Sequence, residues 1–89
     1  MASYRIEWKQ SARKELRKLD RPLVSRLLKA IESLAKEPRP PGSKKLLGSD
    51  HTYRVRIGEY RVVYSVLDSI LIVQIVAVGH RRQIYRRLP

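Results

Sequence analysis

The sequence of 89 residues contains 20 lysines and arginines against eight aspartates and glutamates, which gives a formal net charge of +12. That excess favours a polyanionic partner, either nucleic acid or an acidic protein. There is no cysteine, so disulfides and thiolate metal sites are excluded, and no apolar stretch reaches the length of a membrane span. From the length and these exclusions we expect one domain, residues 1–89, of a soluble intracellular protein that contacts no membrane.

The type of basic residue changes along the chain. Residues 1–45 contain seven lysines and six arginines, whereas residues 46–89 contain seven arginines and no lysine. Arginine grips phosphate or carboxylate through two parallel hydrogen bonds, while lysine is a mobile point charge. The C-terminal half is therefore predicted to recognise the partner.

The N-terminal half is predicted to form a strand and then two helices. Residues 4–8 alternate between apolar and charged, which is the period of a half-buried strand. Ser11 is expected to cap a short amphipathic helix, while Asp20 and Pro22 open a longer helix that stops before Pro38. The apolar residues that these helices would bury are Ala12, Leu16 and Leu19 in the first, and Val24, Leu27, Leu28, Ile31, Leu34 and Ala35 in the second.

The C-terminal half is predicted to form a meander of three strands, after a loop rich in proline at residues 37–43. Residues 53–66 alternate as a hairpin around a two-residue turn at Gly58 and Glu59. Residues 70–79 are almost entirely apolar and β-branched, as in a central strand. The fold class is therefore α+β: a compact, antiparallel-rich sheet of about four strands with two N-terminal helices packed on one face, in the order β-α-α-β-β-β.

The hairpin turn determines which side chains share a face of the sheet. With Gly58 and Glu59 in the turn, Arg56 lies opposite Arg61, and Arg54 points to the same side. Directly opposed like charges destabilise a sheet by about 0.2 to 1 kcal/mol, so stability alone does not favour this arrangement. Two interpretations stay open at this point: a solvated face, or a site that binds an anion.

A basic segment with one tyrosine follows the predicted central strand. His80, Arg81, Arg82 and Tyr85 lie beyond the strand end, where loop residues commonly contribute to a functional face. An aromatic ring among guanidiniums suits single-stranded RNA, because a base stacks on the ring while the arginines hold phosphates. The alternatives are that Tyr85 is a hydrophobic plug and that His80 is a structural residue.

The pattern gives no support to several other chemistries. His51 and His80 have no cysteine or close carboxylate pair to complete a metal site, and the carboxylates nearby are scattered over predicted turns. There is no P-loop, dinucleotide fingerprint or nucleophile elbow, and the helices carry no helix-turn-helix signature. We therefore expect no metal, no cofactor and no sequence-specific DNA contact by this chain alone.

The segments "YRVRIGEYRVVYSV" and "VAVGHRRQIYRR" resemble those of the RelE/ParE superfamily of toxins from prokaryotic toxin–antitoxin pairs. The resemblance covers essentially the whole chain. Its most specific elements are "YRVVY", "VGHRR" and the trailing tyrosine, and "KKLLG" at residues 44–48 is a softer match. The RelE branch is known for ribosome-dependent endonucleases that cut messenger RNA without a metal, whereas the ParE branch poisons DNA gyrase.

For RelE-like chemistry the resemblance implies attack of a ribose 2′-hydroxyl on the adjacent phosphate, which leaves a cyclic phosphate and a free 5′-hydroxyl. Arg61 matches the family arginine that stabilises the phosphate, and Arg81 matches the one near the leaving group. Tyr85 matches the tyrosine that stacks on the substrate or assists proton transfer. Arg54 and Arg56 complete the expected catalytic set, but the best-known RelE enzymes carry lysines there, and arginine effectively cannot lose a proton.

The resemblance also implies the partners. Lys44, Lys45 and Arg82 are expected to bind RNA or the ribosome, as is His80, which is the other candidate base beside Tyr85. The expected partners are a cognate RelB-like antitoxin, the ribosome and messenger RNA in the prokaryotic cytoplasm, with DNA contacted only through the antitoxin complex. The alternative is a ParE-like gyrase inhibitor or a catalytically inactive binding module on the same scaffold.

Overall fold

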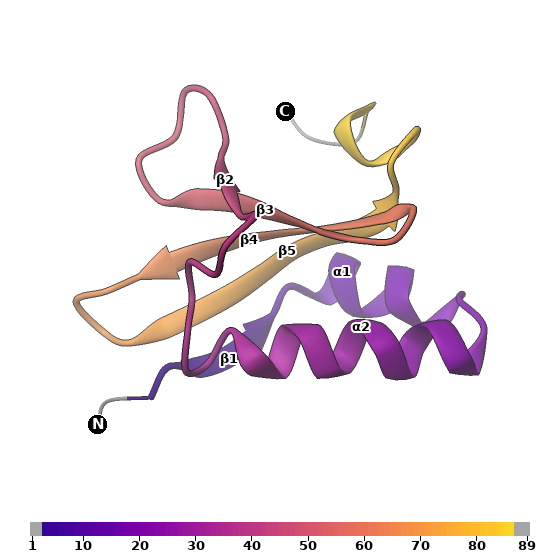
Figure 1. Cartoon of the computed structure of the whole chain (residues 1–89), viewed down its shortest axis with the longest axis horizontal. Coiled ribbons are helices and arrows are strands. Elements are labelled where there is room, and N and C mark those ends of the chain that lie inside the picture. The colour runs from indigo at the N-terminus through magenta and orange to yellow at the C-terminus, as the bar shows by residue number, and fades with distance from the viewer. Residues whose placement is uncertain (1–2, 87–89) are drawn as a thin grey trace.

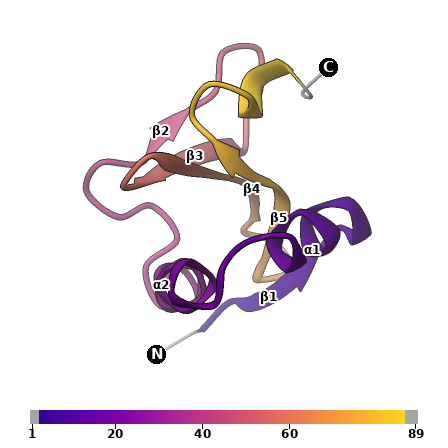
Figure 2. The ribbon, with the colours of Figure 1, turned by 90° about the vertical axis from the view of Figure 1, so that its right-hand side faces the viewer.

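Two helices pack on one face of a five-stranded sheet in the computed structural model, which describes residues 3–86. Both helices lie on the same side of the sheet, which we call the inner face, while the loop before β3 and residues 81–86 lie on the outer face (Figures 1 and 2). The predicted α+β class is confirmed. The elements are β1 (Arg5–Trp8), α1 (Gln10–Arg17), α2 (Arg21–Ser33), β2 (Lys44–Lys45), β3 (Thr52–Ile57), β4 (Tyr60–Leu67), β5 (Ile72–His80) and the 3-10 helix η1 (Ile84–Arg86).

The strands lie in the order β1-β5-β4-β3-β2. β1 runs parallel to β5, and the other neighbours are antiparallel. The prediction of about four strands was one short, because β2 is a two-residue strand in which Lys44 pairs with Arg54 and Lys45 with Tyr53. Two residues are too few to show alternation, so only the pairing with β3 defines this strand.

A hydrogen bond to the sheet determines where α1 begins. The predicted cap at Ser11 was wrong: α1 starts at Gln10, after an extended Lys9 whose N–H donates to the Ile75 carbonyl at 2.9 Å. The sheet therefore holds Lys9 as the last extended residue, and this bond overrides the capping preference of serine. Asp20 is the N-cap residue of α2, as predicted, although its side chain makes no capping bond. Within residues 3–86, no helix is long and apolar enough to cross a membrane.

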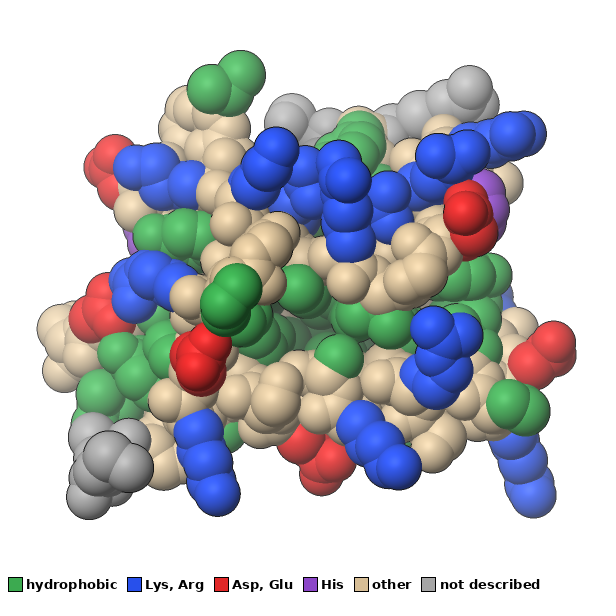
Figure 3. Space-filling view, in the orientation of Figure 1, with side chains coloured by type: hydrophobic (Ala, Val, Ile, Leu, Met, Phe, Trp, Pro, Cys, Tyr) green, Lys and Arg blue, Asp and Glu red, His purple; other side chains and the backbone are tan. Residues whose placement is uncertain are grey.

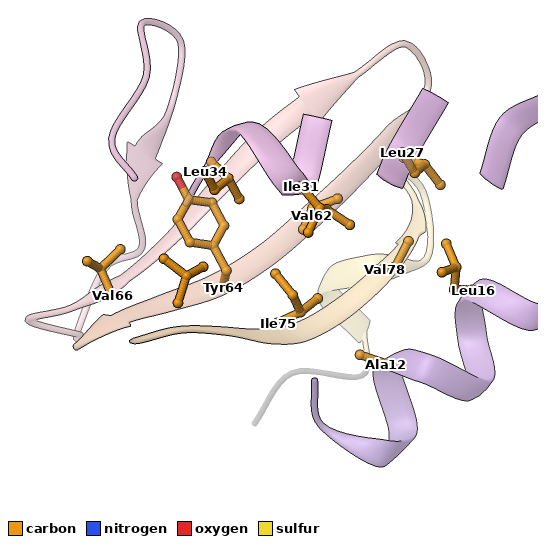
Figure 4. Packing of buried hydrophobic residues seen from close by; sticks show 11 residues of the cluster. Ala12, Leu16, Leu27, Ile31, Leu34, Val62, Tyr64, Val66, Ile75 and Val78 are labelled. Carbon is orange, nitrogen blue, oxygen red and sulfur yellow. The ribbon is translucent and has the colours of Figure 1, made fainter. Parts of the chain in front are cut away.

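The main core fills the space between the helices and the inner face of β4 and β5 (Figure 4). Burial of a large apolar side chain contributes roughly 1.5–3 kcal/mol, so this layer fixes the sheet against the helices. The buried members are Ala12, Leu16, Leu27, Ile31 and Leu34 from the helical half, and Val62, Tyr64, Val66, Val73, Ile75 and Val78 from the strands.

A second, smaller apolar cluster lies on the outer face. Its buried members are Val63, Ala77 and Ile84, with Leu46 and Val76 packed against them. The pairing of β4 with β5 shifts by one residue after Val63, and this bulge lets Val76 and Ala77 both contact the cluster. Because Ile84 is fully buried here, the cluster anchors η1 to the outer face.

A charged network ties the proline-rich loop to the sheet. The Arg39 Nη2 donates to Asp68 at 2.6 Å, its Nε donates to the Tyr53 hydroxyl at 3.0 Å, and the Tyr4 hydroxyl donates to Asp68 at 2.5 Å. Hydrogen bonds from Arg39 and then Tyr4 lower the pKa of Asp68, while the bond to Asp68 is the main cause that raises the pKa of Tyr4. The network thus joins the loop after α2, β3, the β4–β5 turn and the start of β1.

Candidate functional site

The outer face carries an open hollow of about 800 Å³, which we call the basic hollow. Figure 3 shows lysine and arginine side chains gathered in a band across the upper part of the molecule, above the layer of hydrophobic side chains. Seven of the residues around the basic hollow are lysines or arginines. The lining residues are Lys44, Lys45, Leu46, Leu47, Arg54, Arg56, Arg61, Arg81, Arg82 and Tyr85.

The hairpin register explains how the basic hollow forms. The structure pairs Arg56 with Arg61 and Arg54 with Val63, so the predicted register is confirmed. Gly58, with a φ of 60°, takes the first central position of the turn, where the left-handed region favours glycine. All the predicted site residues except His80 line the basic hollow.

Arg61 is the most constrained cation of the basic hollow. Arg61 is only 8% exposed, and its Nη1 donates to the Gly58 carbonyl at 3.0 Å and to the Tyr60 carbonyl at 2.9 Å. Both acceptors belong to the hairpin turn and its flank. The guanidinium is thus held in one orientation before any ligand arrives, which is what electrostatic stabilisation of a reacting group requires.

Arg54 has an unsatisfied donor. Its side chain is part-buried beside Lys44 on β2, and its Nη1 is shielded from solvent without a hydrogen-bond partner in the described part of the chain. A buried donor left without an acceptor costs about 1–3 kcal/mol, and more when the group is charged. An anionic oxygen placed in the basic hollow would remove that cost.

The C-terminal wall of the basic hollow is fixed to the hairpin turn. The Arg81 N–H donates to the Glu59 carbonyl at 2.8 Å, and the Arg81 Nε lies 2.8 Å from the Glu59 carboxylate. Both side chains are at least half exposed, so this ion pair positions Arg81 without contributing much stability. The consequence is that Arg81 and Arg61 meet at the same hollow from segments 20 residues apart in the sequence.

Tyr85 reaches the basic hollow from η1. Its neighbour Ile84 is buried in the outer-face cluster, whereas Tyr85 is 45% exposed. Ile84 therefore takes the role of hydrophobic plug, which leaves the ring of Tyr85 free to contact a ligand. A phenol ring beside guanidiniums can stack on a nucleobase or exchange a proton.

The structure does not bring His80 to the basic hollow. Strand β5 continues through His80, which pairs with Tyr60, while Gly79 pairs with Arg61. Alternation therefore turns His80 toward the inner face, where its ring packs edge-on against Tyr60 with centroids 5.6 Å apart. Its Nδ1 accepts a hydrogen bond from the Arg82 N–H at 3.2 Å, so it helps to shape the turn after β5.

Sequence reasoning missed three residues of this region. Leu46 and Leu47 line the basic hollow, and Glu59 holds Arg81. The leucines follow two lysines in the sequence and carry no charge signal, and the partner of Glu59 lies more than 20 residues further along the chain. Among residues 3–86, histidine, aspartate and glutamate nowhere gather in a group of three that could hold a metal ion.

Comparisons with known proteins agree with this architecture. Residues 6–85 match the family model of the ParE toxin of type II toxin–antitoxin systems, parDE. The mRNA interferase toxin RelE of Escherichia coli K12 is 30% identical over 83 residues, which cover 91% of this chain and 86% of the relative.

Solved structures give the same result. The toxin–antitoxin complex RelBE2 from Mycobacterium tuberculosis matches with a TM-score of 0.80 and 29% identity, and the match covers 91% of this chain and 94% of that chain. The archaeal RelE–RelB complex from Pyrococcus horikoshii OT3 matches with a TM-score of 0.79 and 31% identity, covering 89% and 96%.

The fold and these matches define the class of the protein, a toxin from a toxin–antitoxin pair. The chain belongs to the ParE toxin family of type II toxin–antitoxin systems, and within the RelE/ParE superfamily it is RelE-like.

Proposed function

We propose that this toxin is an endoribonuclease that cuts messenger RNA bound in the ribosome and needs no metal ion. The observation that carries the proposal is the buried Nη1 of Arg54, which has no hydrogen-bond partner among residues 3–86, in a hollow lined by seven lysines and arginines. A phosphodiester supplies the anionic oxygens that such a site lacks. The name of the Escherichia coli relative, mRNA interferase toxin RelE, supports the same activity.

The proposed reaction is transesterification within the RNA. The ribose 2′-oxygen forms a bond to the adjacent phosphorus while the bond from phosphorus to the 5′-oxygen breaks, which leaves a cyclic phosphate and a 5′-hydroxyl. The nucleophile loses a proton, and the leaving oxygen gains one. Arg61, held by two carbonyls, stabilises the charge that grows on the phosphate oxygens, and Arg81 stabilises the leaving oxygen.

Arg54 and Arg56 act as permanent positive charges, because arginine does not lose its proton near neutral pH. Tyr85 is the one phenol in the lining of the basic hollow, so it is assigned both base stacking and part of the proton transfer. His80 lies on the inner face, away from this hollow, so we assign it an RNA contact outside the basic hollow and no part in the chemistry.

Lys44, Lys45 and Arg82 are proposed to hold the RNA and the ribosome rather than to take part in the chemistry. All three are exposed at the rim of the basic hollow. Phosphate contacts of this kind add affinity without selecting a base, and they release counterions on binding.

The proposed partner that silences the toxin is a RelB-like antitoxin. The similar proteins from Mycobacterium tuberculosis and Pyrococcus horikoshii were each solved with an antitoxin. A net charge of +12 favours an acidic antitoxin segment over the basic hollow, and any DNA contact would come through that complex. Expression alone should therefore be toxic in a bacterial host, and co-expression with the antitoxin should restore growth.

A second candidate function is inhibition of DNA gyrase, because the matching family model is named for the ParE toxin. One experiment separates the two functions. A defined message is translated in a bacterial cell-free system with and without the toxin, new RNA 5′ ends are mapped, and gyrase supercoiling is assayed in parallel. Cuts at codon-defined positions support the nuclease. Intact messages together with a loss of gyrase supercoiling would show that the toxin inhibits gyrase instead.

A further inference from the structure

A second hollow, of about 440 Å³, opens on the outer face next to the basic hollow. Both hollows are lined in part by Leu46 and Leu47, from the loop between β2 and β3, so they adjoin along that loop. None of the proposed catalytic residues lines this second hollow. We call it the polar hollow.

Three uncharged polar side chains form a row across the sheet in the polar hollow. Thr52 of β3 pairs with Ser65 of β4, and Ser65 pairs with Gln74 of β5. All three line the hollow together with Val63 and Val76. The bulge after Val63 is what allows Val76 to line this face, so an apolar surface adjoins the polar row.

The polar row has unused hydrogen-bonding capacity. The Thr52 and Ser65 hydroxyl oxygens lie 3.1 Å apart, so one donates to the other and the second proton finds no acceptor within residues 3–86. Ser65 is only 8% exposed, and among the described residues its hydroxyl bonds only to Thr52, so the pair can form a further hydrogen bond with a ligand. The half-buried Gln74 amide also has no partner among the described groups, and it presents both N–H donors and a carbonyl acceptor.

We propose that the polar hollow binds one RNA base beside the scissile phosphate and selects it by hydrogen bonds from Gln74 and the Thr52–Ser65 pair. This inference rests on the proposed nuclease function and adds a subsite for a neighbouring nucleotide. An uncharged row with both donors and acceptors matches the edge of a base, whereas a phosphate bound at the row itself would require charged partners there. The apolar side chains beside the row would contact the ring.

The spacing of the two hollows fits one RNA strand. Arg61 and Ser65 lie on the same face of β4, four residues apart, which is about 14 Å at ~3.4 Å per residue. A strand with splayed bases can therefore place a phosphate at Arg61 and a nearby base at Ser65. Lys9, which also lines the polar hollow, is available for a further phosphate.

The test compares the cutting preferences of four variants and the wild type on a message library in which one codon is randomised. The variants are Gln74→Ala, Gln74→Glu and the double variant Thr52→Val, Ser65→Ala. Gln10→Ala serves as the control, because Gln10 is an exposed glutamine that lines a different hollow beside α1. Each protein, together with the wild type, is added to bacterial cell-free translation, and the 5′ ends are sequenced.

Loss of one neutral hydrogen bond predicts that Gln74→Ala reduces the preference for the favoured base at one codon position by roughly three- to tenfold. The double variant should act at that same position, and Gln74→Glu, which keeps the size but loses both N–H donors, should favour a different base there. Gln10→Ala should keep the wild-type profile. Because Gln74→Glu is nearly isosteric, it tests the subsite even where the alanine variant folds poorly.

Different outcomes separate the two proposals. Wild-type protein that cuts messages, with variant profiles equal to its own, would overturn the base subsite and leave the nuclease standing. Unchanged profiles with weakened antitoxin binding would assign the polar hollow to a protein segment instead. Wild-type protein that cuts no message at all would refute the nuclease and the subsite together.

Discussion

Arg56 and Arg61 lie directly opposite each other across the β3–β4 hairpin, yet Arg61 is buried and Arg56 is exposed. The difference comes from the turn, whose carbonyls accept two hydrogen bonds from Arg61 and so offset part of the repulsion between the two like charges. One arginine of the pair is therefore preorganised, whereas no hydrogen bond from residues 3–86 orients the side chain of the other.

This difference predicts unequal effects of the two alanine substitutions. Arg61→Ala should lower the rate of message cleavage by about 10²- to 10³-fold, the effect of removing one preorganised group that stabilises developing charge. Arg56→Ala should lower it less, because its guanidinium has no fixed orientation. Single-turnover cleavage on programmed ribosomes measures both. Arg5→Ala, which removes the same charge from the exposed edge strand β1, is the matched control. Equal losses for Arg56→Ala and Arg61→Ala would contradict the role of preorganisation.

Tyr85→Phe tests proton transfer separately from stacking. The substitution keeps the ring on η1 and deletes only the hydroxyl. A general-base or general-acid role predicts a loss on the order of 10²-fold or more in single-turnover rate. A pure stacking role predicts little change, and in that case Tyr85→Ala should still weaken RNA binding. Since the arginines leave few other groups for proton transfer, we expect a measurable loss of rate for Tyr85→Phe. A wild-type rate would show that the general base belongs to the RNA or the ribosome.

Replacement of Lys44 and Lys45 by alanine should weaken ribosome binding and leave the fold intact. Both side chains are exposed on the edge strand β2, so the sheet loses no buried contact. Each phosphate contact contributes a slope of about −0.7 to −0.9 to the dependence of log affinity on log salt. The double variant should therefore show a shallower salt dependence, measured by ribosome pelleting at several ionic strengths. If the affinity of the wild type for the ribosome is the same at low and high salt, binding does not depend on contacts between basic side chains and phosphate.

Asp68→Asn should change how stability depends on pH in the acid range. Hydrogen bonds from Arg39 and Tyr4 lower the pKa of Asp68 in the folded state, so the carboxylate stabilises the fold at pH above its unfolded pKa, near 3.9, and this contribution disappears as the pH falls through the folded pKa. The melting temperature of the wild type should exceed that of the variant at pH 6, and the two should converge toward pH 2. Glu37→Gln, an exposed carboxylate outside this network, is the control. Parallel pH curves for the wild type and Asp68→Asn would contradict the prediction.

The pairing register of β3 and β4 could be predicted from the sequence, because a two-residue turn allows only one register. Once Gly58 and Glu59 are assigned to the turn, each side chain of β3 and β4 has a fixed partner and a fixed face. The gathering of Arg54, Arg56 and Arg61 was predictable for the same reason.

Features that depend on distant segments were not predictable in this way. Strand β5 extends one residue beyond Gly79, which turns His80 to the inner face because the end of the strand is set by pairing with Tyr60. The bulge after Val63 reverses the alternation along one part of β5, and because that strand is almost entirely apolar, the periodicity of the sequence does not reveal the polar hollow. The alternation of apolar and polar residues identifies the strands, but it does not show where pairing with a neighbouring strand interrupts that alternation.

The parallel pairing of β1 with β5 has a consequence for the synthesis of the toxin. A chain that grows from its N-terminus makes β1 early and its partner late, so β1 waits without its sheet neighbour while most of the sequence is translated. The wall of the basic hollow that carries Arg81 and Tyr85 is made later still. A nascent chain therefore has an incomplete basic hollow until translation has passed Tyr85, even after β1 to β4 have been made.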